Sequence, residues 1–187
     1  GVEAANKVFL PLLVILFLAL VVRALFLPGA VEGLNAFFTP NWSALADPNV
    51  WLAAFAQIFY SLSVGFGIML TYASYLKPKS NLTGTALVAG FANSSFEILA
   101  GIGVFSAIGF MAHQGGVSVS EVEGLTGPIL SFVTFPKIIS MMPGGPLFGV
   151  LFFSSLVLAG VTSLLSLLQV VSGGLQDKFG WSPARSA

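Results

Sequence analysis

Polar side chains interrupt apolar sequence at three places in this chain. The first is Ser61–Gly67, which sets two serines and two glycines among bulky apolar residues. The second carries an amide at Asn93 and a carboxyl at Glu97, and the third, Thr162–Ser166, holds three hydroxyls. Hydroxyl and carbonyl oxygens can replace the hydration shell of a small monovalent cation. These segments are therefore the candidate positions for binding ions and small polar ligands.

The Ser61–Gly67 segment is expected to break a helix. Glycine is a poor helix former, and two glycines beside serines can open the hydrogen-bond ladder. Inside a bilayer the freed backbone groups meet no water, so a break is tolerated only where it lines an enclosed cavity or holds a ligand. Open carbonyls suit a hard cation, and the N-terminal end of the following half-helix suits a carboxylate. The alternative is that Gly65 and Gly67 only permit close helix packing.

Glu97 is expected to lie in the middle of the bilayer. It follows Ala86 by eleven residues, which is about 16 Å along a helix. A charged carboxylate there costs roughly 2.5–3.5 kcal/mol on insertion scales, so it should be protonated, paired or part of an ion pathway. Asn93 lies on the same helical face, four residues earlier. The alternatives are a structural hydrogen bond between helices for this pair, and bonds to the preceding turn for the hydroxyls of Thr162–Ser166.

The composition excludes an ordinary soluble domain and several classes of enzyme. Of the 187 residues, 56% are hydrophobic and 7% are charged, whereas soluble domains are about 45–50% apolar and about 25% charged. The formal net charge is zero, so the chain lacks the basic surface that binds nucleic acids. Without cysteine and with His113 as its one histidine, it cannot form a Cys/His zinc site or a cysteine nucleophile. We therefore expect that the chain does not bind nucleic acid and is not an enzyme.

The elements that must position these residues are membrane-spanning helices. A crossing needs about 20 mostly apolar residues, and four stretches qualify, at residues 8–27, 50–76, 86–112 and 147–171. Residues 126–142 are apolar enough to form a short helical lid on the outer face, interrupted by Pro136 and Lys137. The sequence therefore predicts an all-α, polytopic integral membrane protein with four transmembrane helices, the second of which is broken at mid-membrane.

The distribution of positive charge predicts the orientation of these spans. Lys77 and Lys79 lie in the short loop at residues 77–82. Other basic residues flank the first and last spans, namely Lys7, Lys178 and Arg185. By the positive-inside rule, both termini and the 77–82 loop face the cytoplasm of a multi-pass protein of the cell membrane. Arg23, near the outer end of the first span, can extend its side chain to the lipid headgroups.

The chain resembles the neurotransmitter:sodium symporter family, and specifically its bacterial sodium-dependent amino-acid transporters. The resemblance runs over essentially the whole chain and is carried by four stretches: Ala56–Gly67 (AQIFYSLSVGFG), Thr71–Tyr75 (TYASY), Asn93–Glu97 (NSSFE) and Ala159–Ser163 (AGVTS). It implies that residues 1–187 are a single membrane fragment with the fifth to eighth helices of the family's inverted-repeat fold. It also implies symport of an amino acid with sodium by alternating access.

The resemblance assigns most of the unusual polar residues to a site. It implies that Ser61 and Asn93 are ligands of a first sodium ion. The second sodium ion would be held by the carbonyl of Ala159 with Thr162 and Ser163. The amino-acid pocket would be lined by Tyr60, Ser63, Phe66, Ser166 and Leu167. Both sodium sites would be incomplete, because the family's first helix, which also supplies ligands, has no counterpart in this chain.

Glu97 has a separate implied role. The resemblance places it where chloride-dependent animal members carry a serine that helps to hold chloride, with Gln57 and Ser61 as neighbours. A fixed carboxyl would replace the anion, which implies chloride independence and a route for proton counter-transport. The expected partners are the amino acid, the lipid bilayer and the missing remainder of the transporter, without which we expect the fragment to be inactive. The alternative function is a structural helical membrane module that self-associates into a homo-oligomer and binds no ligand.

Overall fold

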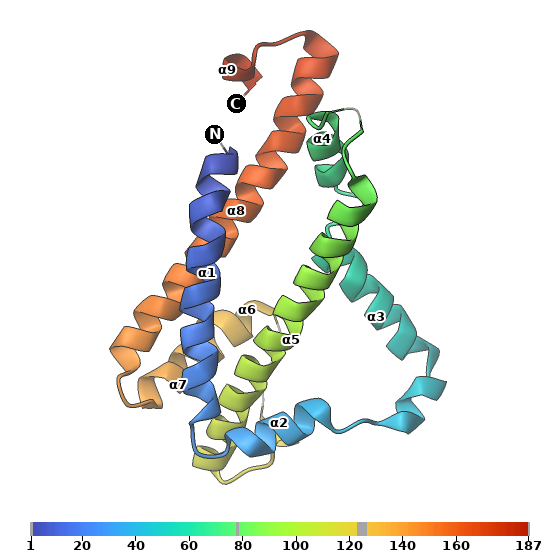
Figure 1. Cartoon of the computed structure of the whole chain (residues 1–187). Helices are drawn as coiled ribbons and strands as arrows, with labels where there is room; N and C mark the ends of the chain where they lie inside the picture. The colour runs from blue at the N-terminus through green and yellow to red at the C-terminus, as the bar shows by residue number, and fades with distance from the viewer. Residues whose placement is uncertain (1, 78, 123–126, 187) are drawn as a thin grey trace. The chain divides into compact units, whose positions relative to one another are not determined.

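The structure, a computed structural model, describes residues 2–77, 79–122 and 127–186, and within these ranges it contains helices and no strands (Figure 1). The long helices are α1 (Val2–Leu25), α5 (Leu82–Gly115) and α8 (Gly145–Phe179). The shorter helices are α2 (Ala30–Phe38), η1 (Trp42–Ala46), α3 (Pro48–Ser61), α4 (Ile68–Ser74), η2 (Val119–Glu121), α6 (Gly127–Ile129), η3 (Leu130–Thr134), α7 (Phe135–Met141) and α9 (Pro183–Ser186).

The chain divides into two compact units. Unit 1 consists of Glu3–Pro40 and Phe96–Ala159, and unit 2 consists of Asn41–Ser95 and Gly160–Ala187. The boundaries fall inside α5 and α8, so each of these helices contributes one half to each unit. The two units are therefore described separately.

Three helices in the described residues are long and apolar enough to cross a membrane. These segments are Lys7–Leu25, Leu82–Gly115 and Gly145–Phe179. They overlap the first, third and fourth predicted spans. The helices themselves extend beyond these spans into polar sequence, because the end of a helix is set by hydrogen bonding and capping rather than by hydropathy. The second predicted span is not one helix, since α3 and α4 are separate. The described residues thus form an all-helical chain with three membrane-length helices.

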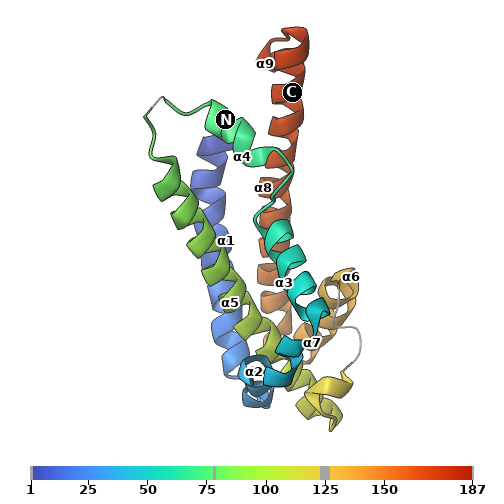
Figure 2. The same ribbon diagram turned by 90° about the vertical axis from the view of Figure 1, so that its right-hand side faces the viewer.

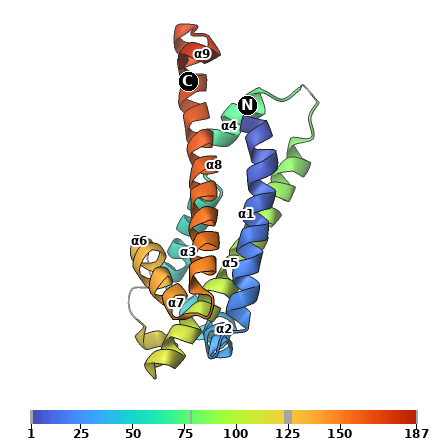
Figure 3. The ribbon, with the colours of Figure 1, turned by 90° about the vertical axis from the view of Figure 1, so that its left-hand side faces the viewer.

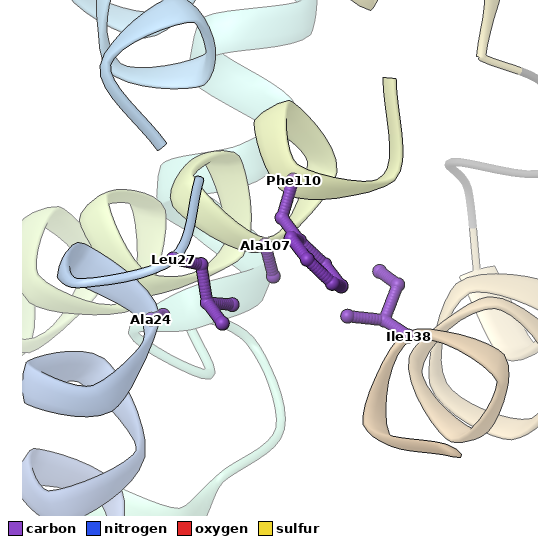
Figure 4. Packing of buried hydrophobic residues seen from close by; sticks show 5 residues of the cluster. All are labelled: Ala24, Leu27, Ala107, Phe110 and Ile138. Atoms are coloured by element: carbon purple, nitrogen blue, oxygen red, sulfur yellow. The ribbon is translucent and has the colours of Figure 1, made fainter. Parts of the chain in front are cut away.

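Unit 1 has a small apolar core where α1, α5 and α7 meet. It consists of Ala24, Leu27, Ala107, Phe110 and Ile138, each at most 6% exposed, and Figure 4 shows Phe110 directed toward Ile138. Figure 3 shows α7 beside the first half of α8, where the rings of Phe135 and Phe152 stack with centroids 5.0 Å apart. In a bilayer the hydrophobic effect does not drive helices together, so close packing of this kind supplies much of the attraction.

Helix α2 packs across α5 through glycines, and hydropathy did not predict this helix. A Cβ atom added to Gly109 would clash with Gly29 O and lie 2.6 Å from the backbone N of Gly33. A Cβ added to Gly33 would clash with Phe105 O. The two backbones therefore touch, as small residues allow in membrane helix pairs. The sequence marks this contact only by the spacing of small residues.

The predicted lid segment is helical up to Met141, and Met142 follows in an extended conformation. Thr126, its first residue, lies outside the described residues, and α6, η3 and α7 follow one another without a gap from Gly127 to Met141. The middle piece, Leu130–Thr134, has π-helical hydrogen bonding. Single π turns widen a helix and occur often at functional sites. Its helical part, Gly127–Met141, has 15 residues, fewer than a crossing needs.

Unit 2 contains the interruption between α3 and α4, which Figure 2 shows as two separate helices joined by a non-helical turn. The Asp47 side chain caps α3 by accepting a hydrogen bond from Asn49 N. After Ser61 the backbone enters the left-handed region at Ser63 (φ 53°), Gly65 (φ 88°) and Gly67 (φ 77°). Left-handed residues cannot continue a right-handed helix, so the chain opens here. The interruption lies within the Ser61–Gly67 segment that was expected to break.

The contact between α2 and α5 predicts the effect of one added methyl group. Gly109→Ala should lower the free energy of unfolding by about 1–3 kcal/mol, because the methyl forces two touching backbones apart. The matched control is Gly90→Ala, on the same helix, where an added Cβ meets nothing within 4 Å. Thermal unfolding in detergent micelles should show a lower midpoint for the first variant only, and equal midpoints would contradict the close approach.

The interruption predicts a purely conformational effect at Gly65. An added Cβ there meets nothing within 4 Å, but the φ of 88° is left-handed. Gly65→Ala should therefore cost roughly 1–2 kcal/mol of stability. Gly160→Ala is the control, since it also has open space but a helical backbone, and it should stabilise α8 by roughly 0.5–1 kcal/mol. Opposite shifts of the thermal midpoint are expected, and a helical backbone at Gly65 would instead give two shifts of the same sign.

Candidate functional site

The interruption opens onto a cavity within unit 2. Its volume is about 450 Å³, which is within the usual range of about 300–1,000 Å³ for small-molecule sites. All five residues that the family resemblance assigns to a substrate pocket line it, together with two of the proposed sodium ligands. The lining residues are Tyr60, Ser61, Leu62, Ser63, Phe66, Ile68, Met69, Ser163, Ser166 and Leu167. None of them is charged, so this wall offers a ligand apolar surface and neutral dipoles.

Two residues predicted to share one ion are in direct contact. Asn93 Nδ2, on α5, donates a hydrogen bond to Ser61 Oγ at the end of α3, over 3.1 Å. The residues are 32 positions apart in the sequence and both are partly buried. In this arrangement the Asn93 carbonyl oxygen remains available, and the Ser61 oxygen retains a lone pair. The two oxygens are suitable ligands for a cation. The same contact also agrees with the alternative, a structural hydrogen bond between helices.

The backbone of the interruption exposes further polar groups. The carbonyls of Leu62, Val64 and Gly65 accept no backbone hydrogen bond from another described residue, and the N–H groups of Gly65 and Gly67 donate none. Several bonds of the turn persist, such as that from Val64 N to Phe59 O at 2.9 Å. Where a bilayer excludes water, an unpaired backbone group costs free energy comparable to a lost hydrogen bond. The segment thus presents both acceptors for a cation and donors for an anion.

The residues predicted for a second ion lie on one face of α8. Thr162 and Ser163 belong to unit 2, and Ala159, the last residue of unit 1, lies about one turn before them on the same helix. Ser166 Oγ donates to Thr162 O at 3.1 Å. This bond to the preceding turn is the common arrangement of a helical serine, and it was the alternative expected for these hydroxyls. The structure places the three predicted ligands together along α8.

Two side-chain hydrogen bonds join the region of α4 to α8 within unit 2, and the sequence did not predict them. Tyr72 OH donates to Ser166 Oγ at 2.9 Å, and Gln169 Nε2 donates to Tyr75 OH at 2.8 Å. Each bond joins residues 94 positions apart. Tyr72 lies on α4 and Tyr75 directly follows its last residue, so the two are about one turn apart, which is the only signal that the sequence offered. These bonds hold the helix after the interruption against the helix that carries Thr162.

Glu97 and Gln57 are placed differently from the other predicted residues. Gln57 is exposed on α3 in unit 2. Glu97 is exposed on α5 and belongs to unit 1, where it has no hydrogen-bond or ion-pair partner in the described part of that unit. Glu97 lies one turn after Asn93 on the continuous helix α5, as the spacing predicted. The structure thus places the carboxyl on the helix of the Asn93 contact, without a partner among the described residues of unit 1.

Known proteins are similar to this chain over most of its length. An uncharacterised sodium-dependent transporter of Methanocaldococcus jannaschii is 45% identical over 185 residues, which are 97% of this chain and 37% of that protein. The sodium- and chloride-dependent creatine transporter 1 of Homo sapiens is 37% identical over 163 residues, 87% of this chain and 26% of its own length. The chain therefore spans well under half the length of these relatives.

A solved structure has the same fold. The crystal structure of MhsT in complex with L-phenylalanine matches 100% of this chain and 40% of its own chain, with a TM-score of 0.81 and 41% identity. This fold and these relatives are those of transporters rather than enzymes. The sodium:neurotransmitter symporter family matches residues 1–186. The chain therefore belongs to the sodium:neurotransmitter symporter family, a family of multi-pass membrane proteins that use sodium.

Proposed function

We propose that this chain is part of a secondary transporter that carries an amino acid inward together with sodium, by alternating access around the interruption between α3 and α4. The observation that carries the proposal is the Asn93–Ser61 contact at 3.1 Å beside the 450 Å³ cavity. It brings neutral oxygen ligands next to open backbone and next to space for a small molecule. A packing role alone would need neither the cavity nor the open carbonyls.

Two sodium positions fit the neutral oxygens of the chain. The first combines Ser61 and Asn93 with groups from outside this chain, and the second combines the Ala159 carbonyl with Thr162 and Ser163. Sodium is a hard cation, and rings of carbonyl and hydroxyl oxygens can replace its water shell. An ion at the first position would also order the interruption. Because ion and substrate then stabilise the same conformation, each raises the affinity for the other.

The proposed substrate is an amino acid whose carboxylate binds the N–H groups of Gly65 and Gly67. Its side chain would lie against Tyr60 and Phe66, while Ser63, Ser166 and Leu167 form the rest of the wall. Two relatives support a carboxylate-bearing substrate: MhsT was crystallised with L-phenylalanine, and the human relative is named a creatine transporter. Both compounds carry one carboxylate beside a nitrogen-bearing group. Backbone N–H groups are well suited to holding such an anion.

The proposed architecture places the interruption at mid-membrane. α3 and α4 would together form the second of four crossings, with α6, η3 and α7 as an outer lid and both termini in the cytoplasm. The remainder of the transporter would supply the ion and substrate ligands that the described residues do not provide. By itself the chain is then expected neither to transport nor to bind sodium tightly. The competing role, a module that self-associates without a ligand, does not account for the open backbone at the cavity.

The proposed ion ligands predict a loss of uptake. Asn93→Leu or Thr162→Leu in the whole transporter should abolish sodium-dependent amino-acid uptake into proteoliposomes, because each removes an oxygen that an apolar side chain cannot replace. Thr85→Leu is the control, since Thr85 is exposed on α5 and its hydroxyl donates to Asn81 O at 2.9 Å, away from the cavity. Uptake that survives both changes would show that the ion assignment is wrong.

Glu97 predicts the response to chloride. We propose that its carboxyl replaces a chloride ion and gives a chloride-independent transporter, in contrast to the human relative, whose name states chloride dependence. Glu97→Ser should therefore create a requirement for chloride, measured as uptake in chloride against gluconate medium. Glu32→Ser, which changes an exposed acid on α2, should leave uptake indifferent to chloride. Continued indifference of the Glu97 variant would rule out this role.

A further inference from the structure

A chain of two hydrogen bonds joins Tyr72, Ser166 and Thr162 within unit 2. Tyr72 OH donates to Ser166 Oγ at 2.9 Å, and Ser166 Oγ donates to Thr162 O at 3.1 Å. Both bonds are partly buried, and the first connects α4 to α8. Two bonds in different directions fix a hydroxyl more firmly than one, because moving it would leave both partners unpaired. Tyr72 therefore helps to hold the Ser166 hydroxyl in one position on α8.

The same bonds determine what the Ser166 hydroxyl can offer to a ligand. A serine hydroxyl has one proton and two acceptor lone pairs. The proton is bonded to Thr162 O and one lone pair accepts from Tyr72, so one lone pair is left by the described residues. Ser166 also lines the cavity at the interruption. Its hydroxyl can therefore accept a hydrogen bond from a molecule in the cavity, but it can donate one only by giving up its bond to Thr162 O.

Among the residues that line the cavity, Ser166 is the polar side chain on α8 that the proposed ions leave available. The α8 residues of this wall are Ser163, Ser166 and Leu167, and Ser163 is a proposed sodium ligand. The open N–H and carbonyl groups that suit the carboxylate and the amino group of an amino acid belong to the interruption. A substrate held there by its backbone groups extends its side chain toward α8, where it meets Ser166 and Leu167.

We propose that the transporter selects amino acids whose side chain carries a hydrogen-bond donor, with Ser166 as the acceptor and Tyr72 as the residue that positions it. This inference rests on the proposed function, because it concerns the substrate of that site. A site that hydrogen-bonds a substrate hydroxyl discriminates against the analogue without it, since its own polar group then loses a partner. A wall that only packs against an apolar side chain predicts the opposite preference, because a hydroxyl placed there loses its hydrogen bonds to water.

The test uses the whole transporter in proteoliposomes and measures sodium-driven uptake of a radiolabelled mixture of the common amino acids against unlabelled competitors. The competitors form two pairs that differ in one hydroxyl: L-threonine with L-valine, and L-tyrosine with L-phenylalanine. In the pair that competes at lower concentration, the member with the hydroxyl should need about threefold to tenfold less for half-inhibition, the effect of one hydrogen bond. Its O-methyl ether keeps the oxygen but lacks the proton, so it should compete no better than the member without the hydroxyl.

Variants of Ser166 locate the preference. Ser166→Ala removes the acceptor and should reverse the preference, because the substrate hydroxyl is then left without a partner. Ser166→Thr should retain it, since a threonine hydroxyl can also bond to the preceding turn of a helix. If Ser166→Ala abolishes all uptake, the wild-type ratios and the O-methyl ethers decide the outcome.

A variant of Tyr72 tests the positioning role. Tyr72→Phe should reduce the preference by about twofold or more, because the acceptor remains but has lost one of its two bonds. The half-inhibition concentration of the competitor without a hydroxyl should stay the same. Tyr75→Phe is the matched control, since the Tyr75 hydroxyl accepts from Gln169 Nε2 at 2.8 Å on the same helix α8, and it should leave the ratio unchanged. A general weakening of the fold would change both concentrations together and would not move their ratio.

The outcomes separate this inference from the proposed function. Absence of sodium-driven uptake of any amino acid by wild type would overturn the proposed function and this inference with it. Uptake by wild type with no advantage of the hydroxyl in either pair, or with no competition by any of these amino acids, would overturn this inference alone. A preference that survives Ser166→Ala would exclude Ser166 as the acceptor, and one that is unchanged in Tyr72→Phe would exclude the positioning role of Tyr72.

Discussion

The constraint on which this structure depends is that backbone polar groups in a bilayer must find partners within the protein or its ligands. A continuous helix such as α5 meets this requirement by itself, over the 34 residues from Leu82 to Gly115. The segment between Ser61 and Ile68 does not, because three positive φ angles leave carbonyl and N–H groups without helical partners. Everything that makes unit 2 suited to ions follows from this opening: the hydroxyl and amide at Ser61 and Asn93 contact each other beside it, and the cavity is next to it. In the proposed function, a cation and an anion bound to the exposed groups would offset the free-energy cost of the opening.

The two units meet the same constraint in different ways. Unit 1 is held by close packing: glycines let α2 touch α5, Phe37 stacks on Phe105 with centroids 4.8 Å apart, and its core residues are almost fully buried. Unit 2 has a single buried residue in its described part, Ser172, and is held largely by side-chain hydrogen bonds such as those of Tyr72 and Tyr75 to α8. Local stability follows the density of buried contacts, so unit 2 should open at lower free energy than unit 1.

Much of this organisation could be predicted from sequence, for reasons visible in particular residues. Long apolar runs predicted α1, α5 and α8, and the serines and glycines of Ser61–Gly67 predicted a break because they oppose helix formation within such a run. The contact between Asn93 and Ser61 came from the resemblance, since no local pattern relates residues 32 positions apart. Helix α2 was missed because its nine residues are too few for a crossing and its contact depends on glycines, which carry no hydropathy signal. The hydrogen bonds between α8 and the tyrosines Tyr72 and Tyr75 were missed for a similar reason. Each depends on where the tertiary structure places one hydroxyl, and the sequence around a tyrosine does not indicate that position.

Each unit has a cavity, and the chemistry of the two cavities follows from which backbone lies behind each wall. The unit 1 cavity lies between α1, α5, η3, α7 and the first half of α8, where the backbone is helical and internally bonded, so its surface is set by side chains and is almost wholly apolar. Around the unit 2 cavity the interruption itself forms the wall, so a polar guest finds unsatisfied partners there. Ala159 connects these two settings, because it lines the apolar cavity and lies about one turn before Thr162 on α8.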